Sequence, residues 1–367
     1  MATTPEHRVA IVSASVGAGH DGVAAELTRR LTDAGWAVDR YDFLDLLPAA
    51  VGRAIVRGYT HGLRSAPWTW QATVAAFDRA WPARVAGWAS RAADTALSDA
   101  LAPGTAAVVS TYPLASQSLG RLRRTGRLAA PAITYLTDPA VHRTWLAPGV
   151  DVHLTPYLAA GIQAMRHGAV GVHVVAPAVA PGFRPPRDRR EVTDARTAYR
   201  LPPVGRLALI VTGSLGLGHP ERTARDVLDT GLATPVVVCG RHVTLYQRLT
   251  GIPGVRALGW VDDMPTLMRA VDVVIDNAGG MTLLEALATG APVLTYRPLA
   301  GHGSANAGCL DAAGLVRWVR RPFDLGHALA DALSGRHAPR LGSDADPLDW
   351  ITRTAAGPGA SVSSSAG

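Results

Sequence analysis

Each half of the chain opens with the same local pattern, an apolar strand followed by a glycine-rich turn and then a helix. In the first half the strand-like run 8–15 leads into the turn 17–20, and in the second half the run 207–214 leads into a loop with three glycines at 213–218. A strand that feeds a helix through a tight turn is the opening unit of a parallel, doubly wound sheet. The repeated pattern therefore predicts an α/β protein with two Rossmann-like domains.

Further apolar runs alternate with helical patterns in both halves, as in βαβ units. These runs lie at 37–47, 106–113, 132–138, 150–155 and 172–179, and then at 235–241, 255–260, 272–277 and 292–297. Between the halves, residues 184–206 are rich in Pro and Arg and predict a linker with one short helix. The predicted domains are therefore 1–183 and 207–340, followed by a tail at 341–367 whose small, polar end we expect to be disordered.

The composition is that of a globular protein, with 48% apolar and 18% charged residues in a chain of 367 residues. This length suffices for two domains, each with its own core. Cys239 and Cys309 are the only cysteines, which excludes a disulfide scaffold. The apolar runs are too short for a transmembrane helix, and the first residues lack the regions of a signal peptide. We therefore expect a cytoplasmic protein.

The formal net charge is +7, and all 36 Lys and Arg residues are Arg. An excess of positive charge favours anionic partners such as nucleotides or an acidic membrane surface. The arginines form no long block, and aromatic residues do not alternate with them as in a groove that stacks nucleic-acid bases. We therefore expect no nucleic-acid partner.

The turn at the start of the first half contains Gly17, Gly19 and His20. Glycines let the backbone approach a ligand closely, and the free amides at the start of the next helix attract an anion. His20 would lie at the carboxyl end of the sheet, where α/β folds bind ligands. The alternative is a tight turn with a solvated histidine. The spacing departs from the GxGxxG fingerprint and gives little support to an NAD site.

The loop at the start of the second half contains Gly213, Ser214, Gly216 and Gly218. Three glycines before a helix are typical of a cradle for a diphosphate. A glycine-rich loop without a ligand is the alternative. The loop has no Lys, so it is not a Walker A loop.

The most informative segment is 276–287, where a strand ends in Gly279 and Gly280 and a helix begins near Thr282. Amides at Gly280 and Met281 would be free for phosphate. Glu285 would lie on the first turn, where a carboxylate can bridge the two hydroxyls of a ribose. The alternative is a capping box, because Thr282 and Glu285 have the required spacing, although capping alone does not require the glycine pair.

These motifs together resemble the inverting glycosyltransferases of the GT-B fold, in the group that contains MurG and the monogalactosyl- and glucosyl-diacylglycerol synthases. The resemblance runs over roughly residues 8–335. The matched positions are Gly17–His20, then Thr137, Asp138, His142 and Trp145, then Gly213–Gly218, and finally Gly279, Thr282, Glu285, Ala286 and Asn306.

The chain departs from this family in the segment 300–306. The family has an acid–amide pair there, such as Gln-Glu, which holds hydroxyls of the donor sugar. His302 and Gly303 replace that pair here, and Leu215 replaces a Glu of the plant-type enzymes. Sites built to hydrogen-bond a hydroxyl discriminate strongly, so the donor sugar of this chain is left open.

The resemblance implies two domains that face an interdomain cleft, with a nucleoside diphosphate sugar, UDP or dTDP, bound by the second domain. Glu285 would hold the ribose, and the loop 213–218 and the helix start at 280–282 would hold the phosphates, with His302 and Asn306 nearby. The base for the acceptor hydroxyl would be His20 or Asp138, and His142 would orient either one. No metal or cofactor is expected, because the only Asp-x-Asp, at 344–346, lies near the tail.

The first domain would bind the acceptor through Gly17, Gly19 and Trp145, and through the region 49–92. Trp68 and Trp70 lie in this region among arginines. Trp together with Arg on amphipathic helices suits a membrane interface, and a lipid acceptor at the inner face of the membrane would fit. Core tryptophans beneath a solvated arginine face are the alternative.

Three further functions stay open beside a lipid hexosyltransferase. A glycosyltransferase of the same fold could act on a soluble natural-product acceptor. A nucleotide-sugar 2-epimerase shares the fold, although the turn at Gly17–His20 argues against it. A non-catalytic partner protein would explain the change at His302 and Gly303, whereas retention of His20 and Glu285 opposes it.

Overall fold

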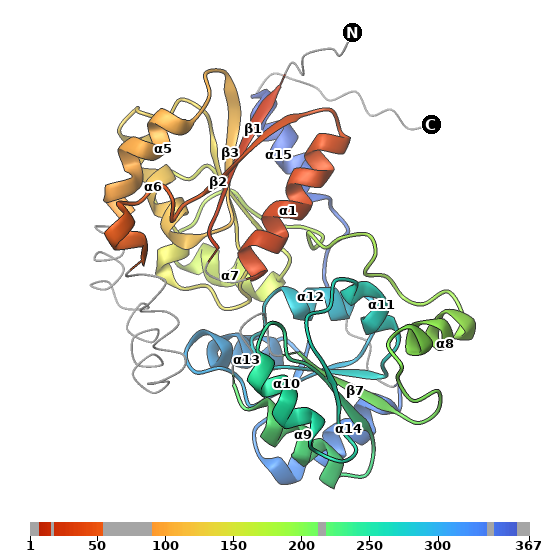
Figure 1. Ribbon diagram of the computed structural model, residues 1–367. Coiled ribbons are helices and arrows are strands. Elements are labelled where there is room, and N and C mark those ends of the chain that lie inside the picture. Colours follow the sequence, from red (N-terminus) through yellow and green to blue (C-terminus); the bar gives the residue numbers. More distant parts are fainter. Residues whose placement is uncertain (1–6, 16–17, 54–89, 212–217, 336–340, 358–367) are drawn as a thin grey trace. The chain divides into compact units, whose positions relative to one another are not determined.

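The computed structural model describes residues 7–15, 18–53, 90–211, 218–335 and 341–357. These residues divide into two compact units. The first unit is formed by the residues up to 178 together with those from 342, and the second by those between 179 and 341. Each unit is built around its own six-stranded sheet (Figure 1).

The first unit has six parallel strands in the order β2-β1-β3-β4-β5-β6. Its described elements are β1 (Arg8–Ser13), α1 (Ala18–Asp33), β2 (Ala37–Asp42), η1 (Arg91–Ala93), α5 (Asp94–Ala100), β3 (Thr105–Ser110), α6 (Pro113–Arg124), β4 (Ala132–Tyr135), η2 (Arg143–Trp145), β5 (Val152–Thr155), α7 (Leu158–Arg166), β6 (Val172–Val174) and α15 (Pro347–Ala356). Residues 9–12 of β1 are completely buried, as expected for a parallel sheet covered on both faces. Figure 1 shows α1 and α15 on one face of this sheet and α5 and α6 on the other.

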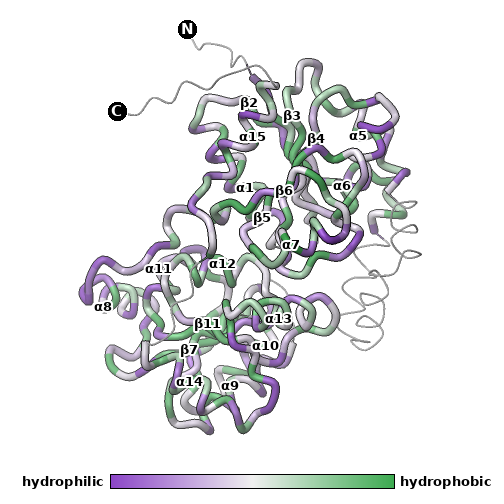
Figure 2. Tube along the Cα trace, turned by 180° about the vertical axis from the view of Figure 1, so that it is seen from behind, coloured by the Kyte–Doolittle hydropathy of each residue, from purple (hydrophilic) through white to green (hydrophobic). Residues whose placement is uncertain are grey.

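The second unit repeats this plan with the strand order β12-β11-β10-β7-β8-β9. Its described elements are α8 (Arg189–Ala198), β7 (Leu207–Val211), α9 (Pro220–Asp229), β8 (Thr234–Val238), α10 (Val243–Thr250), β9 (Arg256–Leu258), α11 (Met264–Arg269), β10 (Val273–Asp276), α12 (Met281–Ala288), β11 (Val293–Tyr296), α13 (His302–Ala312), β12 (Arg317–Val319), η3 (Pro322–Asp324) and α14 (Leu325–Leu333). Ala208 and Ile210 of β7 pack under α9, α10 and α14 in one apolar cluster. Figure 2 shows hydrophobic residues concentrated along the strands of both units.

In both sheets the strand order reverses at one point, between β1 and β3 in the first unit and between β7 and β10 in the second. Chain connections leave in opposite directions on the two sides of such a point, which opens a crevice at the carboxyl ends of the strands. The turns that follow β1, β3, β7 and β10 therefore define where each unit can hold a ligand. The prediction of an α/β protein with two Rossmann-like units is confirmed.

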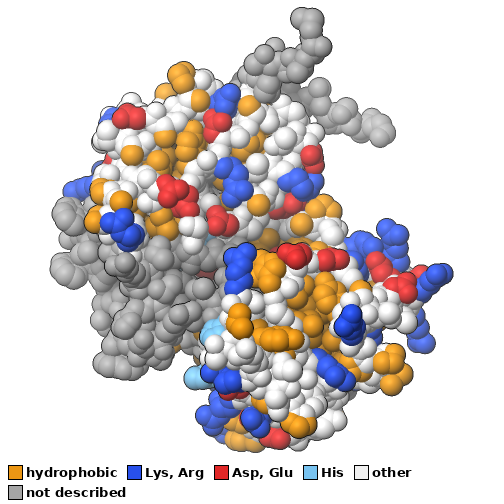
Figure 3. Space-filling model, viewed as in Figure 1, with side chains coloured by type: hydrophobic (Ala, Val, Ile, Leu, Met, Phe, Trp, Pro, Cys, Tyr) orange, Lys and Arg blue, Asp and Glu red, His pale blue; other side chains and the backbone are white. Residues whose placement is uncertain are grey.

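The segment 184–206 contains one short helix, α8, as predicted, and the tail contains the helix α15, which was not predicted. The end of the tail, residues 358–367, lies outside the described residues. Within 184–206, α8 packs against α11 and belongs to the second unit. Its charged residues Arg189, Arg190 and Asp194 are exposed (Figure 3), whereas Arg196 is buried. Within the tail, α15 packs on β3 and α1 of the first unit. The indole of Trp350 stacks on His173 with ring centroids 3.5 Å apart, and Ile351 is fully buried. The short strand β12 was not predicted.

The burial of Ile351 predicts that α15 contributes to the stability of the first unit. We expect Ile351→Ala to lower the free energy of unfolding of the first unit by about 3 kcal/mol, because a buried methylene-rich side chain leaves a cavity. The matched control is Val170→Ala, whose side chain is 65% exposed and which should change the value by less than about 0.5 kcal/mol. Urea unfolding measures both. Equal effects of the two variants would show that α15 does not complete the first unit.

Candidate functional site

In the first unit a hydrogen bond joins the two turns that flank the switch point, the turn after β1 and the turn after β3. His20 is the third residue of α1, directly after the β1 turn. Thr111 follows β3, and its hydroxyl donates a hydrogen bond to the carbonyl of His20 at 3.2 Å. Gly19 lies beside His20 in α1, whereas Gly17 lies outside the described residues. The first turn of α1 is thus held at the topological switch point of the sheet.

The imidazole of His20 is surrounded by polar and aromatic groups. Its Nδ1 atom lies 3.1 Å from the hydroxyl oxygen of Thr137. The rings of Tyr112 and Trp145 lie 5.5 and 5.8 Å from it, centroid to centroid. Burial lowers the pKa of His20, while the charge of Asp138 acts in the opposite direction. A neutral imidazole is the form that accepts a proton, so this environment suits a general base.

Trp145 brings the three predicted catalytic residues together. Its Nε1–H donates to Oδ2 of Asp138 at 3.1 Å, and its ring lies 6.2 Å from the ring of His142. His142 in turn hydrogen-bonds through Nδ1 to the hydroxyl of Thr144. Trp145 is fully buried, where it orients Asp138 and packs against both histidines. Its expected contact with an acceptor stays a prediction. Trp68 and Trp70 lie outside the described residues.

In the second unit the turn after β10 is folded by one carboxylate. Oδ2 of Asp276 accepts the amide hydrogens of Ala278 and Gly279 at 3.1 and 2.6 Å. Gly279 has φ of 72°, a backbone conformation that a residue with a side chain rarely adopts. Asp276 is only 2% exposed, and this burial raises its pKa to about 6. The shape of the turn therefore requires glycine at position 279.

Helix α12 begins without a side-chain cap. Gly280 is its N-cap residue, and Thr282 is already the second residue of the helix. The capping-box alternative for Thr282 and Glu285 is therefore wrong, since the capping residue of such a box is the N-cap itself. The first amides of a helix have no partner within the helix. Those of Met281 and Thr282 are thus available to an anion.

Glu285 lies one turn further along α12, on the same face as Met281. Its side chain is half-buried, and the described residues provide it with no hydrogen-bond or ion-pair partner. Loss of solvent raises its pKa to about 7. An unpaired carboxyl group in such a place costs free energy. A ligand with hydroxyl donors would recover that cost, so Glu285 and the start of α12 form a site for a molecule with both hydroxyl and anionic groups.

Two neighbouring turns pack tightly on the β10 turn. Gly218 has φ of 93°, and a Cβ atom there would lie 2.7 Å from Nδ2 of Asn277. Asn306 of α13 is 1% exposed and donates from Nδ2 to the carbonyl of Ala278 at 3.1 Å. The side chain of Asn306 thus supports the β10 turn, and its expected contact with the donor stays a prediction. His302 is the first residue of α13 and is half-buried, whereas Gly213, Ser214 and Gly216 lie outside the described residues.

Two further residues lie at the carboxyl edge of the second sheet, and the sequence analysis did not name them as site residues. Arg241 follows β8, and its guanidinium lies 4.1 Å above the ring of Trp260, which follows β9. The indole is 49% exposed. Trp260 was interpreted as the end of a strand, and only the structure shows that the strand ends at Leu258 and leaves the ring at the edge of the sheet.

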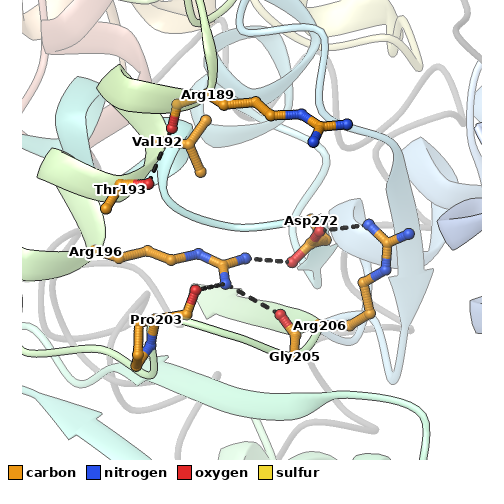
Figure 4. Close-up of a pocket in the computed structure, with 8 residues that line it drawn as sticks. All are labelled: Arg189, Val192, Thr193, Arg196, Pro203, Gly205, Arg206 and Asp272. Atoms are coloured by element: carbon orange, nitrogen blue, oxygen red, sulfur yellow. Dashed lines mark hydrogen bonds and ion pairs between the residues drawn. The ribbon is translucent and has the colours of Figure 1, made fainter.

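A cavity of about 540 Å³ opens at the opposite, amino-terminal edge of the second sheet. Arg196 of α8 and Arg206 meet there at Asp272, and Arg196 also donates to the carbonyl of Gly205 (Figure 4). The carboxylate of Asp272 is thereby neutralised by two guanidinium groups. These contacts attach α8 to the sheet, so we assign the cavity a structural role. The described residues contain no group of three or more His, Cys, Asp or Glu side chains that could hold a metal ion.

No protein-family model matches the chain. The processive diacylglycerol beta-glucosyltransferase of Bacillus subtilis (strain 168) is 26% identical over 235 residues, which are 62% of this chain and 60% of that relative. The chain thus matches less than two thirds of the length of this relative. No helix in the described part of the chain is long and apolar enough to cross a membrane.

Solved structures of glycosyltransferases share the fold of this chain. MurG of Acinetobacter baumannii superposes with a TM-score of 0.58 at 18% identity, over 94% of this chain and 99% of that one. The calicheamicin glycosyltransferase superposes with a TM-score of 0.56 at 15% identity, over 89% of this chain and 90% of that one. The chain is therefore a GT-B-fold protein that resembles the group of MurG and the diacylglycerol glycosyltransferases.

Proposed function

We propose that the chain is an inverting glycosyltransferase that moves a hexose from a UDP-sugar to a hydroxyl group of a lipid acceptor. The observation that carries this proposal is the half-buried, unpartnered carboxyl group of Glu285, one turn from the uncapped start of α12. The Glu285 carboxyl group can accept hydrogen bonds from the hydroxyls of a ribose, and the free amides at the start of α12 can bind a diphosphate. The two lie together at the switch point of the sheet, so they match a nucleotide.

On the donor side, Glu285 would accept hydrogen bonds from both ribose hydroxyls. The amides of Met281 and Thr282 would bind the diphosphate and stabilise the negative charge that develops on it as the bond to the sugar carbon breaks. Gly218 ends the glycine loop to which the family resemblance assigns phosphate contacts. Departure of the diphosphate would then need no metal ion, since the helix start supplies the positive potential.

On the acceptor side, His20 would take the proton of the attacking hydroxyl. In the tautomer whose Nδ1–H donates to the Thr137 hydroxyl, the Nε2 lone pair is free for that proton. The nearby carboxylate of Asp138, oriented by Trp145, would stabilise the imidazolium that forms. The acceptor oxygen bonds to the sugar carbon as the nucleoside diphosphate leaves, so one displacement inverts that centre.

The lipid acceptor rests on sequence similarity. The name of the Bacillus subtilis relative specifies diacylglycerol as acceptor and a beta linkage in the product. A lipid hydroxyl is presented at a membrane surface, so we also propose peripheral binding to an anionic membrane, which the net charge of +7 favours.

The raised pKa of Glu285 generates a prediction for nucleotide binding. Only the ionised carboxylate accepts both ribose hydroxyls, so the affinity for UDP should rise about tenfold between pH 6 and pH 8 as Glu285 ionises near pH 7. Glu285→Gln should weaken binding at least tenfold at pH 8 and flatten the pH profile. Isothermal titration calorimetry measures both effects.

The control for this experiment is Glu221→Gln, which removes an exposed carboxylate paired with Arg248 in the same unit. It should leave the affinity and its pH dependence unchanged. If UDP binds to the Glu285→Gln variant as it does to the wild type, the proposed ribose site is wrong.

The assignment of His20 generates a second prediction. The imidazole should titrate below its ordinary range in NMR, and Asp138→Asn should lower its pKa further, because the charge of Asp138 raises that pKa. His20→Gln should reduce sugar transfer by about 10²–10⁴-fold while it leaves UDP binding intact. The exposed His327 provides the control variant His327→Gln. Full transfer activity in His20→Gln would assign the base elsewhere.

A further inference from the structure

Arg297, the first residue after β11, has φ of 51°. In the described part of the chain only Arg200 shares this feature among residues other than glycine. The left-handed conformation brings Cβ close to the backbone and is unfavourable for such residues. A strained residue persists only where its surroundings hold it in place. The conformation of Arg297 therefore requires an anchor.

The anchor is the carboxylate of Asp226 on α9. Its Oδ2 atom accepts hydrogen bonds from Nε and Nη2 of Arg297 at 3.0 and 2.6 Å, and from the hydroxyl of Tyr296 at 2.7 Å. The side chains of Arg297 and Asp226 are only 18% and 21% exposed. Charge-assisted hydrogen bonds in a partly desolvated place are strong. One carboxylate thus holds the last residue of β11 and the first residue after it.

The turn that follows Arg297 is pressed against the β10 turn. The amide of Leu299 donates to the carbonyl of Asn277 at 2.7 Å, and the amide of Ser304 donates to the carbonyl of Leu299 at 3.0 Å. A Cβ atom on Gly303 would lie 3.0 Å from both the carbonyl oxygen of Asn277 and Cβ of Leu299. No side chain fits at position 303 without moving this turn, so His302 is the side chain presented at the start of α13.

We propose that Asp226 is a positioning residue that sets how the donor sugar is bound. This inference rests on the proposed function: with the ribose on Glu285 and the diphosphate on the start of α12, the group beyond the diphosphate reaches the adjacent turn 297–303. That turn can recognise sugar hydroxyls only through its backbone and His302. Its selectivity depends on where the turn is held, and the ion pair of Asp226 with Arg297 holds it.

The test compares UDP with UDP-sugars in the full chain by isothermal titration calorimetry. UDP-glucose, UDP-galactose and UDP-N-acetylglucosamine are titrated first into the wild type to find the sugar that binds best. Asp226→Ala should leave the Kd of UDP within twofold, because the ribose and phosphate contacts lie on α12. It should weaken binding of the best UDP-sugar at least fivefold. Asp331→Ala, which removes the ion pair with Arg317 in the same unit, is the matched control and should change neither value.

Two double variants test the conformational cause. In the Asp226→Ala background, Arg297→Gly should restore UDP-sugar binding to within twofold of the wild type, because glycine adopts positive φ without strain. Arg297→Ala should not restore it, since alanine keeps the Cβ atom. The proposal is overturned if Arg297→Gly and Arg297→Ala restore UDP-sugar binding equally, or if Arg297→Gly does not restore it.

The remaining outcomes separate this inference from the function on which it rests. Asp226→Ala with unchanged UDP-sugar binding, or with equal losses for UDP and UDP-sugar, overturns the positioning role alone. A wild type that binds neither UDP nor any UDP-sugar overturns the proposed function and this inference with it.

Discussion

The hydrogen bonds that the Asp276 carboxylate accepts from the backbone are the interaction on which the second unit's site depends. They turn the chain sharply after β10, and Gly279 takes the left-handed conformation that this turn requires. Helix α12 then begins without a cap, and Glu285 lies one turn along it. The turns at Gly218 and Leu299 pack against the same bend. Loss of this one buried carboxylate would displace every group that we assign to the nucleotide.

In the first unit the indole of Trp145 has the corresponding role of orienting the residues of the site. Trp145 is fully buried and arranges Asp138, His20 and His142 about its ring. In both units a buried side chain orients the groups that we propose bind the ligand, and each cluster lies where the strand order reverses. Acid–base chemistry is thus assigned to one sheet and anion binding to the other, as the transfer of a sugar from a nucleotide requires.

Much of this organisation could be predicted from the sequence, because it depends on local periodicity and glycine turns. The strand–turn–helix pattern located both switch points, and the glycine pair at Gly279 marked the start of α12. The burial of Trp145 and Asn306 and their hydrogen bonds to Asp138 and to the carbonyl of Ala278 could not be predicted from the sequence. Burial and partners come from residues distant in sequence: the ring of Trp145 packs on His20, which lies near the start of the chain, and Asn306 meets Ala278 across 28 residues. The helix α15 was missed because a polar tail hides the single buried face around Ile351.

The most direct test of the central claim is a transfer assay on the intact protein. Diacylglycerol in anionic vesicles is incubated with each UDP-hexose, and glycolipid and released UDP are quantified by mass spectrometry. The account predicts one UDP for each sugar transferred, with release that requires the acceptor and a beta linkage in the product. Binding of UDP without any sugar transfer to the lipid would contradict the proposed acceptor. UDP release that is independent of any acceptor would contradict the assignment as a transferase.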